Sequence, residues 1–257
     1  MSIEAARRRR GLLVPAVFAC LGLAVLVALG IWQLDRRAWK EALIASIESR
    51  VDAAAVALPP PERWARLDPA RDEFRRVTFA AEFLNGQEAL VYTSGSALRS
   101  DVAGPGYWVF TPARIGGGDL VMVNRGFVPE KERDTIGRTA GQIFGVTDIE
   151  GVMRWPERSS WFTPAADSAR RLWFVRDHLA MAAAKGLTVA PFYVDQEAPP
   201  APGGLPRAGK LVVNLPNNHL QYALAWFGLA LVLVGVFAAF VLSQRRERRV
   251  GEGGERA

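Results

Sequence analysis

Two uncharged apolar stretches, one near each end of the 257-residue chain, constrain its fold more than any other feature. The first covers residues 11–34, with Pro15 and Gln33 near its edges, and the second covers residues 220–242. At about 1.5 Å of rise per residue, a helix over either stretch exceeds the roughly 30 Å hydrocarbon core of a bilayer. The sequence therefore predicts a transmembrane hairpin with residues 35–219 on one side of the membrane.

Basic residues in the two tails predict the orientation. Residues 1–10 hold four arginines and residues 243–257 hold five, so the positive-inside rule puts both tails in the cytoplasm and residues 35–219 outside. Arg36, Arg37 and Lys40 oppose this only weakly, because long translocated segments tolerate such charges. We expect a multi-pass protein of the inner (plasma) membrane.

The first span has two competing interpretations, a cleaved signal peptide and a lipoprotein signal processed at Cys20. The span is longer than the apolar core of a typical signal peptide. Phe18 stands where lipoprotein processing expects a small residue, and the apolar run continues past Cys20. An uncleaved anchor is favoured.

The segment between the spans is nearly neutral and free of cysteine. Residues 35–219 hold 23 basic and 22 acidic side chains, which removes the electrostatic argument for a nucleic-acid partner. Without cysteine the segment has no disulfide framework, so its stability must come from packing. Its length suits one domain with a single core.

Periodicity predicts a β-rich α+β domain outside the membrane, carried by the two-helix hairpin. Apolar positions from Trp39 to Val51 recur at helical spacing, so the first span should continue as a juxtamembrane helix until prolines 59–61 end the helical region. Runs of β-branched and aromatic residues between turn signals predict strands. The expected strands are 77–84, 89–93, 107–111, 120–124, 143–154, 172–175, 188–194 and 211–215.

Further expectations concern the rest of the domain. A helix is expected over 177–185, closed by Gly186. Pro191 limits strand 188–194 to a sheet edge, and residues 199–209 have the composition of a flexible surface crossing. A barrel-like closure would remove the exposed edges of so many short strands.

Four strings in order resemble the Surfeit locus protein 1 (Shy) family of cytochrome c oxidase assembly factors, over nearly the whole chain. The strings are Gly30-Ile31-Trp32-Gln33 with Arg36, Trp39 and Lys40; Gly106-Tyr107-Trp108-Val109 with Thr111-Pro112; Val123-Asn124-Arg125-Gly126-Phe127-Val128-Pro129; and Pro216-Asn217-Asn218-His219-Leu220-Gln221-Tyr222-Ala223. Three positions depart from the family pattern: Phe127 and Asp167 replace a common Trp and Asn, and Ala225 replaces Thr. The chain is similar to a divergent member.

The resemblance implies a function in building haem-copper (cytochrome c) oxidase. Members of the family carry two spans around one exterior domain, and bacterial relatives bind haem a transiently and deliver it to the oxidase catalytic subunit. The residue matching their haem-linked histidine is His219. The implied partners are that subunit, haem a synthase and the membrane, and the family implies a chaperone rather than an enzyme.

The residues around His219 suit this implication. His219 should lie in the first turn of the second span, where the positive end of the helix dipole favours a neutral ring, and a neutral ring can ligate iron. Tyr222, Ala223, Trp226 and Ala230 follow on the same helical face, which could receive a porphyrin edge. Hence His219 is the candidate ligand of the haem iron, with Tyr222 and Trp226 as candidate cofactor contacts. The alternative is that these residues are interfacial anchors.

Other residues keep two interpretations each. His178 is expected on a solvated surface. Arg125 either meets a haem propionate or an acidic partner, or, as we favour, fixes its loop within the domain. Trp32 and Gln33 could face His219 across the hairpin, but an interfacial belt explains Trp32 equally well. Small residues on the spans should allow close helix packing: Gly22, Ala24, Ala28, Gly228 and Gly235.

Several function classes lose support from the sequence. It lacks the Gly-x-Ser-x-Gly, His-Glu-x-x-His and phosphate-loop motifs of common enzymes, and the exterior segment lacks the soft-ligand cluster of a copper carrier. The main alternative is a scaffold that stabilises an oxidase assembly intermediate without binding haem. A membrane-anchored sensor or secretion component is a third hypothesis, and a homo-oligomer offering two histidines stays open.

Overall fold

Helix α1 (Ile3–Val51) begins the computed structural model, which describes residues 3–96, 99, 101–212 and 217–254. Between Gly30 and Val51 the helix contains no glycine or proline, so its backbone is not interrupted beyond the first apolar stretch. This confirms that the first apolar stretch continues as a helix. The helix ends at Val51, before the prolines, because Ile47 and Val51 pack against Val152 and Leu211 of the β domain.

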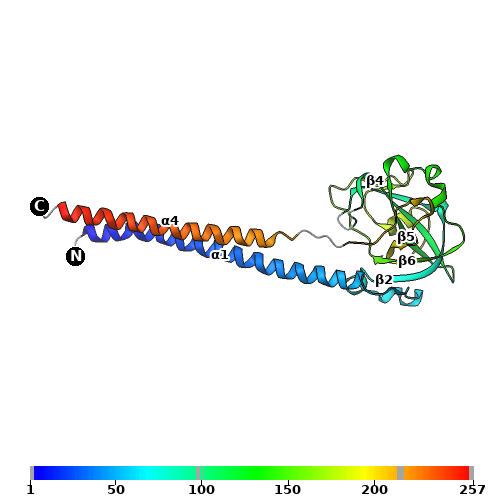
Figure 1. Cartoon of the computed structure of the whole chain (residues 1–257), viewed down its shortest axis with the longest axis horizontal. Helices are drawn as coiled ribbons and strands as arrows, with labels where there is room; N and C mark the ends of the chain where they lie inside the picture. The colour runs from blue at the N-terminus through cyan, green and yellow to red at the C-terminus, as the bar shows by residue number, and fades with distance from the viewer. Residues whose placement is uncertain (1–2, 97–98, 100, 213–216, 255–257) are drawn as a thin grey trace. The chain divides into compact units, whose positions relative to one another are not determined.

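Helix α4 (His219–Gly254) runs antiparallel to α1, with its end beside the start of α1 (Figure 1). Both helices are long and apolar enough to cross a membrane. The α1–α4 pair, residues 1–43 and 216–257, is one compact unit, and residues 44–215 form the other, called the β domain below.

The β domain contains one mixed sheet. In the described part of the chain its strand order is β1-β2-β6-β8-β5-β4-β3-β7. The strands are β1 (Val56–Ala57), β2 (Arg76–Phe83), β3 (Ala89–Gly95), β4 (Ala103–Ile115), β5 (Leu120–Pro129), β6 (Val146–Arg154), β7 (Leu172–Trp173) and β8 (Tyr193–Ala198). The helical elements are η1 (Pro61–Arg66), α2 (Pro69–Asp72), η2 (Asn85–Gln87), η3 (Glu130–Glu132), η4 (Thr135–Gly141), α3 (His178–Ala183) and η5 (Pro202–Gly204).

Strand β2 closes the sheet into a barrel, because it pairs with β6 along one edge and with β4 along the other. The closed barrel therefore has five strands, β2, β6, β8, β5 and β4, four of which are labelled in Figure 1. Alternate residues of these strands fill its interior, among them Val77, Val121 and Ile149. The opposite face of β4 and β5 is covered by Met181 and Ala182 of α3. The predicted fold class, including barrel-like closure, is confirmed.

Strand β8 differs from the prediction. It begins at Tyr193, two residues after Pro191, and lies between β5 and β6 instead of at an edge. Pro191 is thus outside the hydrogen-bonded ladder and imposes no edge position. Of the predicted strand 211–215, Leu211 and Val212 are not in a strand, and the remaining residues lie outside the described part.

The segment 199–209 is fixed to the domain, so the prediction of a flexible crossing was wrong. Phe127 N donates to Arg207 O at 3.1 Å, and Arg207 N donates to Phe127 O at 2.8 Å. Gly126 permits this approach: its φ is +119°, and a Cβ there would collide with the backbone carbonyl of Arg207. Only glycine avoids both the strained φ and the collision.

Gly126→Ala is expected to lower the free energy of unfolding of the β domain by about 2 kcal/mol, from backbone strain and displacement of the 199–209 segment. Urea titration of the detergent-solubilised full chain, followed by tryptophan fluorescence, would measure the loss. Gly116→Ala is the matched control, since a Cβ at Gly116 meets nothing within 4 Å. Equal midpoints for the two variants would contradict this role of Gly126.

Candidate functional site

His219 is the first residue of α4, and Gln33 of α1 lies beside it. The distance between His219 Nδ1 and Gln33 Oε1 is 2.7 Å, and both side chains are half-buried. The prediction that Gln33 faces His219 across the hairpin is confirmed. Trp32, in contrast, is 49% exposed on α1. Pro216, which begins the fourth string, lies outside the described residues.

Close packing of the two helices positions this contact. Gly30 lies one turn before Gln33 and is buried, and a Cβ there would lie 2.5 Å from Phe227 Cε1. A larger residue at position 30 would push α1 away from α4 and separate Gln33 from His219. Gly22 approaches Leu233 in the same way, with a hypothetical Cβ at 3.3 Å.

Not all of the predicted small residues serve this packing. Ala24 and Ala28 are exposed, and a Cβ at Gly228 or Gly235 would meet nothing within 4 Å. These four predictions were wrong, because the positions lie off the contact face of the pair. Among the residues of α4 whose burial the structure describes, the buried small residues are Ala223, with 1% of its surface exposed, and Ala230, with 5%.

The predicted face of α4 is thus only partly open. Ala223 and Ala230 are covered within the helix pair, whereas Tyr222 is 58% exposed and Trp226 is half-buried. A planar ligand at His219 therefore has access on the Tyr222 side of the helix and not on the alanine side. The α1–α4 groove of about 400 Å³ lies elsewhere, lined by residues such as Cys20, Leu233 and Phe237.

Cationic and aromatic side chains follow Gln33 on α1. The Arg36 guanidinium carbon lies 5.8 Å from the Trp32 ring centre and 5.6 Å from that of Trp39. Arg37 pairs with Glu41 at 2.7 Å. Positive charge is therefore available within one turn of the His219–Gln33 contact.

His178 is fully buried, so its predicted surface position was wrong. Its Nε2 lies 3.0 Å from the carbonyl oxygen of Ala190, and its ring packs 5.4 Å from Tyr193. Burial lowers the pKa of His178 to about 4, although the Ala190 carbonyl and Asp177 act in the opposite direction. His178 is a core residue under the N-terminus of α3.

Arg125 is also internal, which settles its two interpretations in favour of the structural one. The side chain is 1% exposed, stacks on Phe83 at 4.4 Å, and donates to Asn85 Oδ1 and to the carbonyl oxygen of Gly141. Burial lowers the pKa of Arg125 to about 10, while nearby Glu88 raises it. Arg125 therefore remains charged at neutral pH within one end of the barrel.

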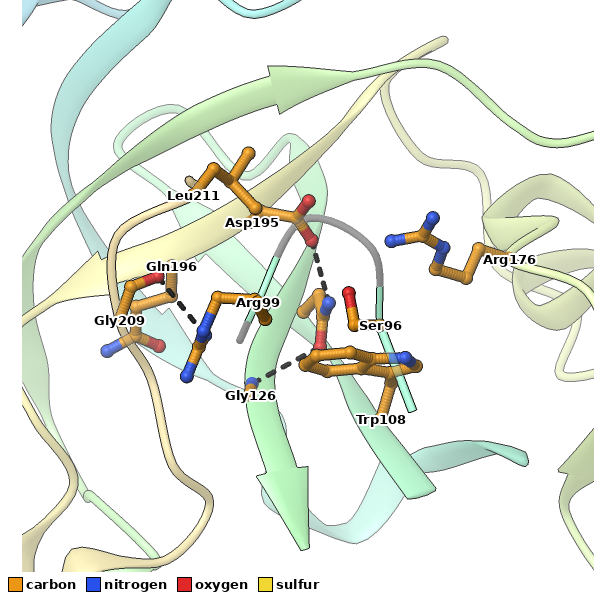
Figure 2. A pocket seen from close by; sticks show the side chains of 10 residues that line it. Ser96, Arg99, Trp108, Gly126, Arg176, Asp195, Gln196, Gly209 and Leu211 are labelled. Atoms are coloured by element: carbon orange, nitrogen blue, oxygen red, sulfur yellow. Dashed lines mark hydrogen bonds between the residues drawn. The ribbon is translucent and has the colours of Figure 1, made fainter. Parts of the chain in front are cut away.

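A polar pocket lies on the outer side of β5 and β8, and Figure 2 shows the side chains that line it. Asn124 Nδ2 donates to Asp195 Oδ1 at 2.7 Å, and Asn124 Oδ1 accepts from Gly126 N at 3.2 Å. Arg99 donates to the carbonyl oxygen of Gly209 at 3.1 Å. The cavity of about 10 Å³ holds roughly one water molecule, so it is too small for an organic cofactor.

Sequence analysis did not identify the charged groups of this region. Asp195 is 6% exposed and pairs with Arg154 at 3.4 Å, and Arg176 pairs with Glu157 at 2.5 Å. Burial also raises the pKa of the neighbouring Tyr193 hydroxyl. A charged residue in a sequence normally indicates a solvent-exposed position, so no local signal predicts that these side chains are buried.

Comparison with known proteins supports the family resemblance of the four sequence strings. The model of the SURF1 family matches residues 20–231. The chain belongs to the SURF1 family. It is 32% identical to a SURF1-like protein of Monosiga brevicollis over 92% of this chain and 90% of that protein. It is 34% and 35% identical to the Surfeit locus protein 1 of Rattus norvegicus and of Homo sapiens, over 80% and 79% of this chain and 69% of each relative.

In this SURF1-family chain the four strings meet in pairs. The two central strings lie on β4 and β5, where Trp108 is the register partner of Phe127 and their rings pack at 5.9 Å. Phe127, a departure from the family pattern, thus keeps an aromatic ring at this contact. The first and last strings supply Gln33 and His219. Family resemblance therefore marks two spatial clusters, one in the helix pair and one in the β domain.

Proposed function

We propose that this chain is an assembly factor for haem-copper (cytochrome c) oxidase that binds haem a transiently at His219 and delivers it to the oxidase catalytic subunit. The observation that carries the proposal is the His219 ring itself. Its Nδ1 is engaged by Gln33 at 2.7 Å, and its Nε2 makes no hydrogen bond among the described residues. Imidazole nitrogen is a common axial ligand of haem iron.

The surroundings of His219 suit haem as a cargo. Tyr222 and Trp226 offer flat apolar rings on the accessible side, and Arg36 offers a guanidinium to an anionic propionate. Bound haem would supply an iron centre, and His219 would be the residue that holds it. One histidine ligand per chain, His219, would hold such a cargo loosely enough for transfer.

Topology is part of the proposal. Arginines before the first span and after the second favour cytoplasmic termini, with the β domain outside an inner (plasma) membrane. His219 would then lie at the outer membrane surface. Oxidase catalytic subunits and haem a synthase are the proposed partners at that surface, and the chain would act as a chaperone without catalysing a reaction.

A scaffold that stabilises an oxidase assembly intermediate without binding haem is the second candidate. The observation that favours it is the exposure of Trp161 and Phe162, which are 88% and 75% exposed and stack on each other at 3.8 Å. Exposed aromatic pairs are typical anchors of protein interfaces. The scaffold hypothesis predicts that a strain lacking this chain assembles less oxidase, and that the oxidase that does assemble has a normal haem content.

The test is purification of the full chain from cells that synthesise haem a. We expect wild-type protein to carry haem a absorbance, His219→Ala to lose it, and Gln221→Ala, an exposed position two residues further on α4, to retain it. A colourless wild-type protein would overturn haem binding. Haem retained stoichiometrically in His219→Ala would instead remove His219 from the site.

A further inference from the structure

We propose that Gln33 is a positioning residue that holds the His219 ring in the tautomer that carries its proton on Nδ1, leaving Nε2 free for iron. This inference rests on the proposed function and deepens it, because it assigns the ligating atom. The contact that carries it is the 2.7 Å pair between His219 Nδ1 and Gln33 Oε1.

The chemistry of the pair determines where the proton lies. A carboxamide oxygen only accepts hydrogen bonds, so the ring nitrogen facing it must donate. In a neutral imidazole one nitrogen carries the hydrogen and the other carries a lone pair. With the proton on Nδ1, the lone pair is on Nε2, which makes no hydrogen bond among the described residues.

Without Gln33 the ring would lose this preference. Neutral histidine in water favours the opposite tautomer, with its hydrogen on Nε2, and that form has no lone pair to offer at Nε2. Metal-ligating histidines generally donate their second ring N–H to an acceptor, which fixes both tautomer and ring orientation. Gln33 supplies such an acceptor from the other helix.

The fold holds Gln33 firmly in place. Gly30, one turn earlier, fits against Phe227, two turns after His219, so this helix contact fixes the separation of the two backbones one to two turns from the pair. The half-buried position of both side chains limits competition from water. The hydrogen bond therefore follows from the same close packing that requires glycine at position 30.

A neutral acceptor suits a carrier better than a charged one. A carboxylate at position 33 would pull harder on the Nδ1 proton, make Nε2 more basic and strengthen its bond to iron. A carboxamide orients the ring without this increase. It also places no net charge beside the apolar span, where charge is costly.

Nitrogen-15 NMR of the full chain tests the tautomer directly. The chain has two histidines, so ¹⁵N-histidine labelling yields two rings, and His219→Ala identifies the signals of His219. Spectra would be recorded at about pH 8, above the pKa of an ordinary imidazole. We expect wild-type protein and Gln33→Glu to carry the proton on Nδ1, and Gln33→Leu to shift the population toward Nε2–H.

Gln221→Leu is the matched control, because it removes an exposed carboxamide near the same end of the hairpin without touching His219. It should leave the tautomer unchanged. A wild-type ring protonated on Nε2 would overturn the inference, since the amide group of Gln33 would then be the donor. An unchanged tautomer in Gln33→Leu would overturn it as well.

Titration of purified haem a into the same full-length proteins separates the inference from the proposed function. We expect Gln33→Leu to bind about tenfold more weakly than wild type, and Gln33→Glu to bind at least as tightly, with a lower iron midpoint potential. Haem a binding through His219 with Nε2–H in the free protein would overturn the inference alone. If wild type binds no haem a although its His219 ring carries the proton on Nδ1, the proposed function and the assigned ligating role are overturned. The hydrogen bond between Gln33 and His219 would still stand.

Discussion

Glu88→Gln is expected to lower the free energy of unfolding of the β domain by about 3–5 kcal/mol, the usual cost of removing one partner from a buried ion pair. Glu88 is 4% exposed. Arg138 donates to both of its carboxylate oxygens, at 3.1 and 2.7 Å, and Arg125 lies 3.8 Å away. One carboxylate thus serves two buried guanidinium groups.

The neutral amide cannot replace this charge. It would leave Arg125 and Arg138 as mutually repelling cations in a region of low dielectric constant, and it would turn one acceptor oxygen into a donor that faces their N–H groups. Gln142, which donates to Glu88 Oε1 at 3.0 Å, would face the same conflict. The loss of stability therefore comes mainly from buried cations left without a counter-charge, and less from the removal of one salt bridge.

Urea denaturation of the full chain in detergent would measure the effect through near-UV circular dichroism. Glu82→Gln is the matched control, because Glu82 is exposed on the neighbouring strand β2. Adding Arg138→Met to Glu88→Gln should recover part of the loss, since one unpaired cation is removed. A Glu88→Gln midpoint equal to that of the Glu82→Gln control would show that the network contributes no stability.

This network also shows where prediction from sequence ends. Glu88 and Arg138 are 50 residues apart in the chain, and nothing in their surroundings distinguishes them from solvated charges. Only closure of the barrel brings the two together at one end. His178 was misplaced for the same reason: its burial depends on Ala190 and Tyr193, which lie in another segment.

Long-range contacts are predictable where a physical constraint replaces local pattern. Gln33 and His219 are 186 residues apart, yet the sequence makes their contact a candidate, because a two-span hairpin places the end of one span and the start of the next at the same depth. The strands are predictable because turn signals and β-branched runs are local. Strand order is not, since the pairing of β2 with both β6 and β4 depends on the whole sheet.

The second large effect concerns His178, whose burial should make the β domain sensitive to acid. Its pKa is lowered from 6.5 to about 4 in the folded chain, chiefly by desolvation. The unfolded chain therefore binds a proton near pH 6.5, whereas the folded chain resists it until about pH 4. Stability from this group is complete above the unfolded pKa and falls as the pH drops between the two values.

The size of the loss follows from the shift. Each pKa unit corresponds to about 1.4 kcal/mol, so the lowered pKa of His178 predicts a loss of about 3 kcal/mol by pH 4. Two carboxylates paired with arginines add to the acid sensitivity. Arg99 lowers the pKa of Asp101. Burial raises the pKa of Glu157, but its pairing with Arg176 outweighs this and leaves the pKa lowered. A variant without the imidazole is therefore needed to isolate the histidine.

His178→Gln provides that comparison, because its amide can still donate to the Ala190 carbonyl but does not titrate. Unfolding free energies of both proteins, measured by urea titration at intervals from about pH 7.5 to pH 4, should diverge in slope. Wild type should lose about 3 kcal/mol more than His178→Gln over that range. Parallel curves would mean that the folded chain accepts the proton on His178 as readily as the unfolded chain does. Water could allow this by reaching Nδ1, which is buried without a hydrogen-bond partner among the described residues.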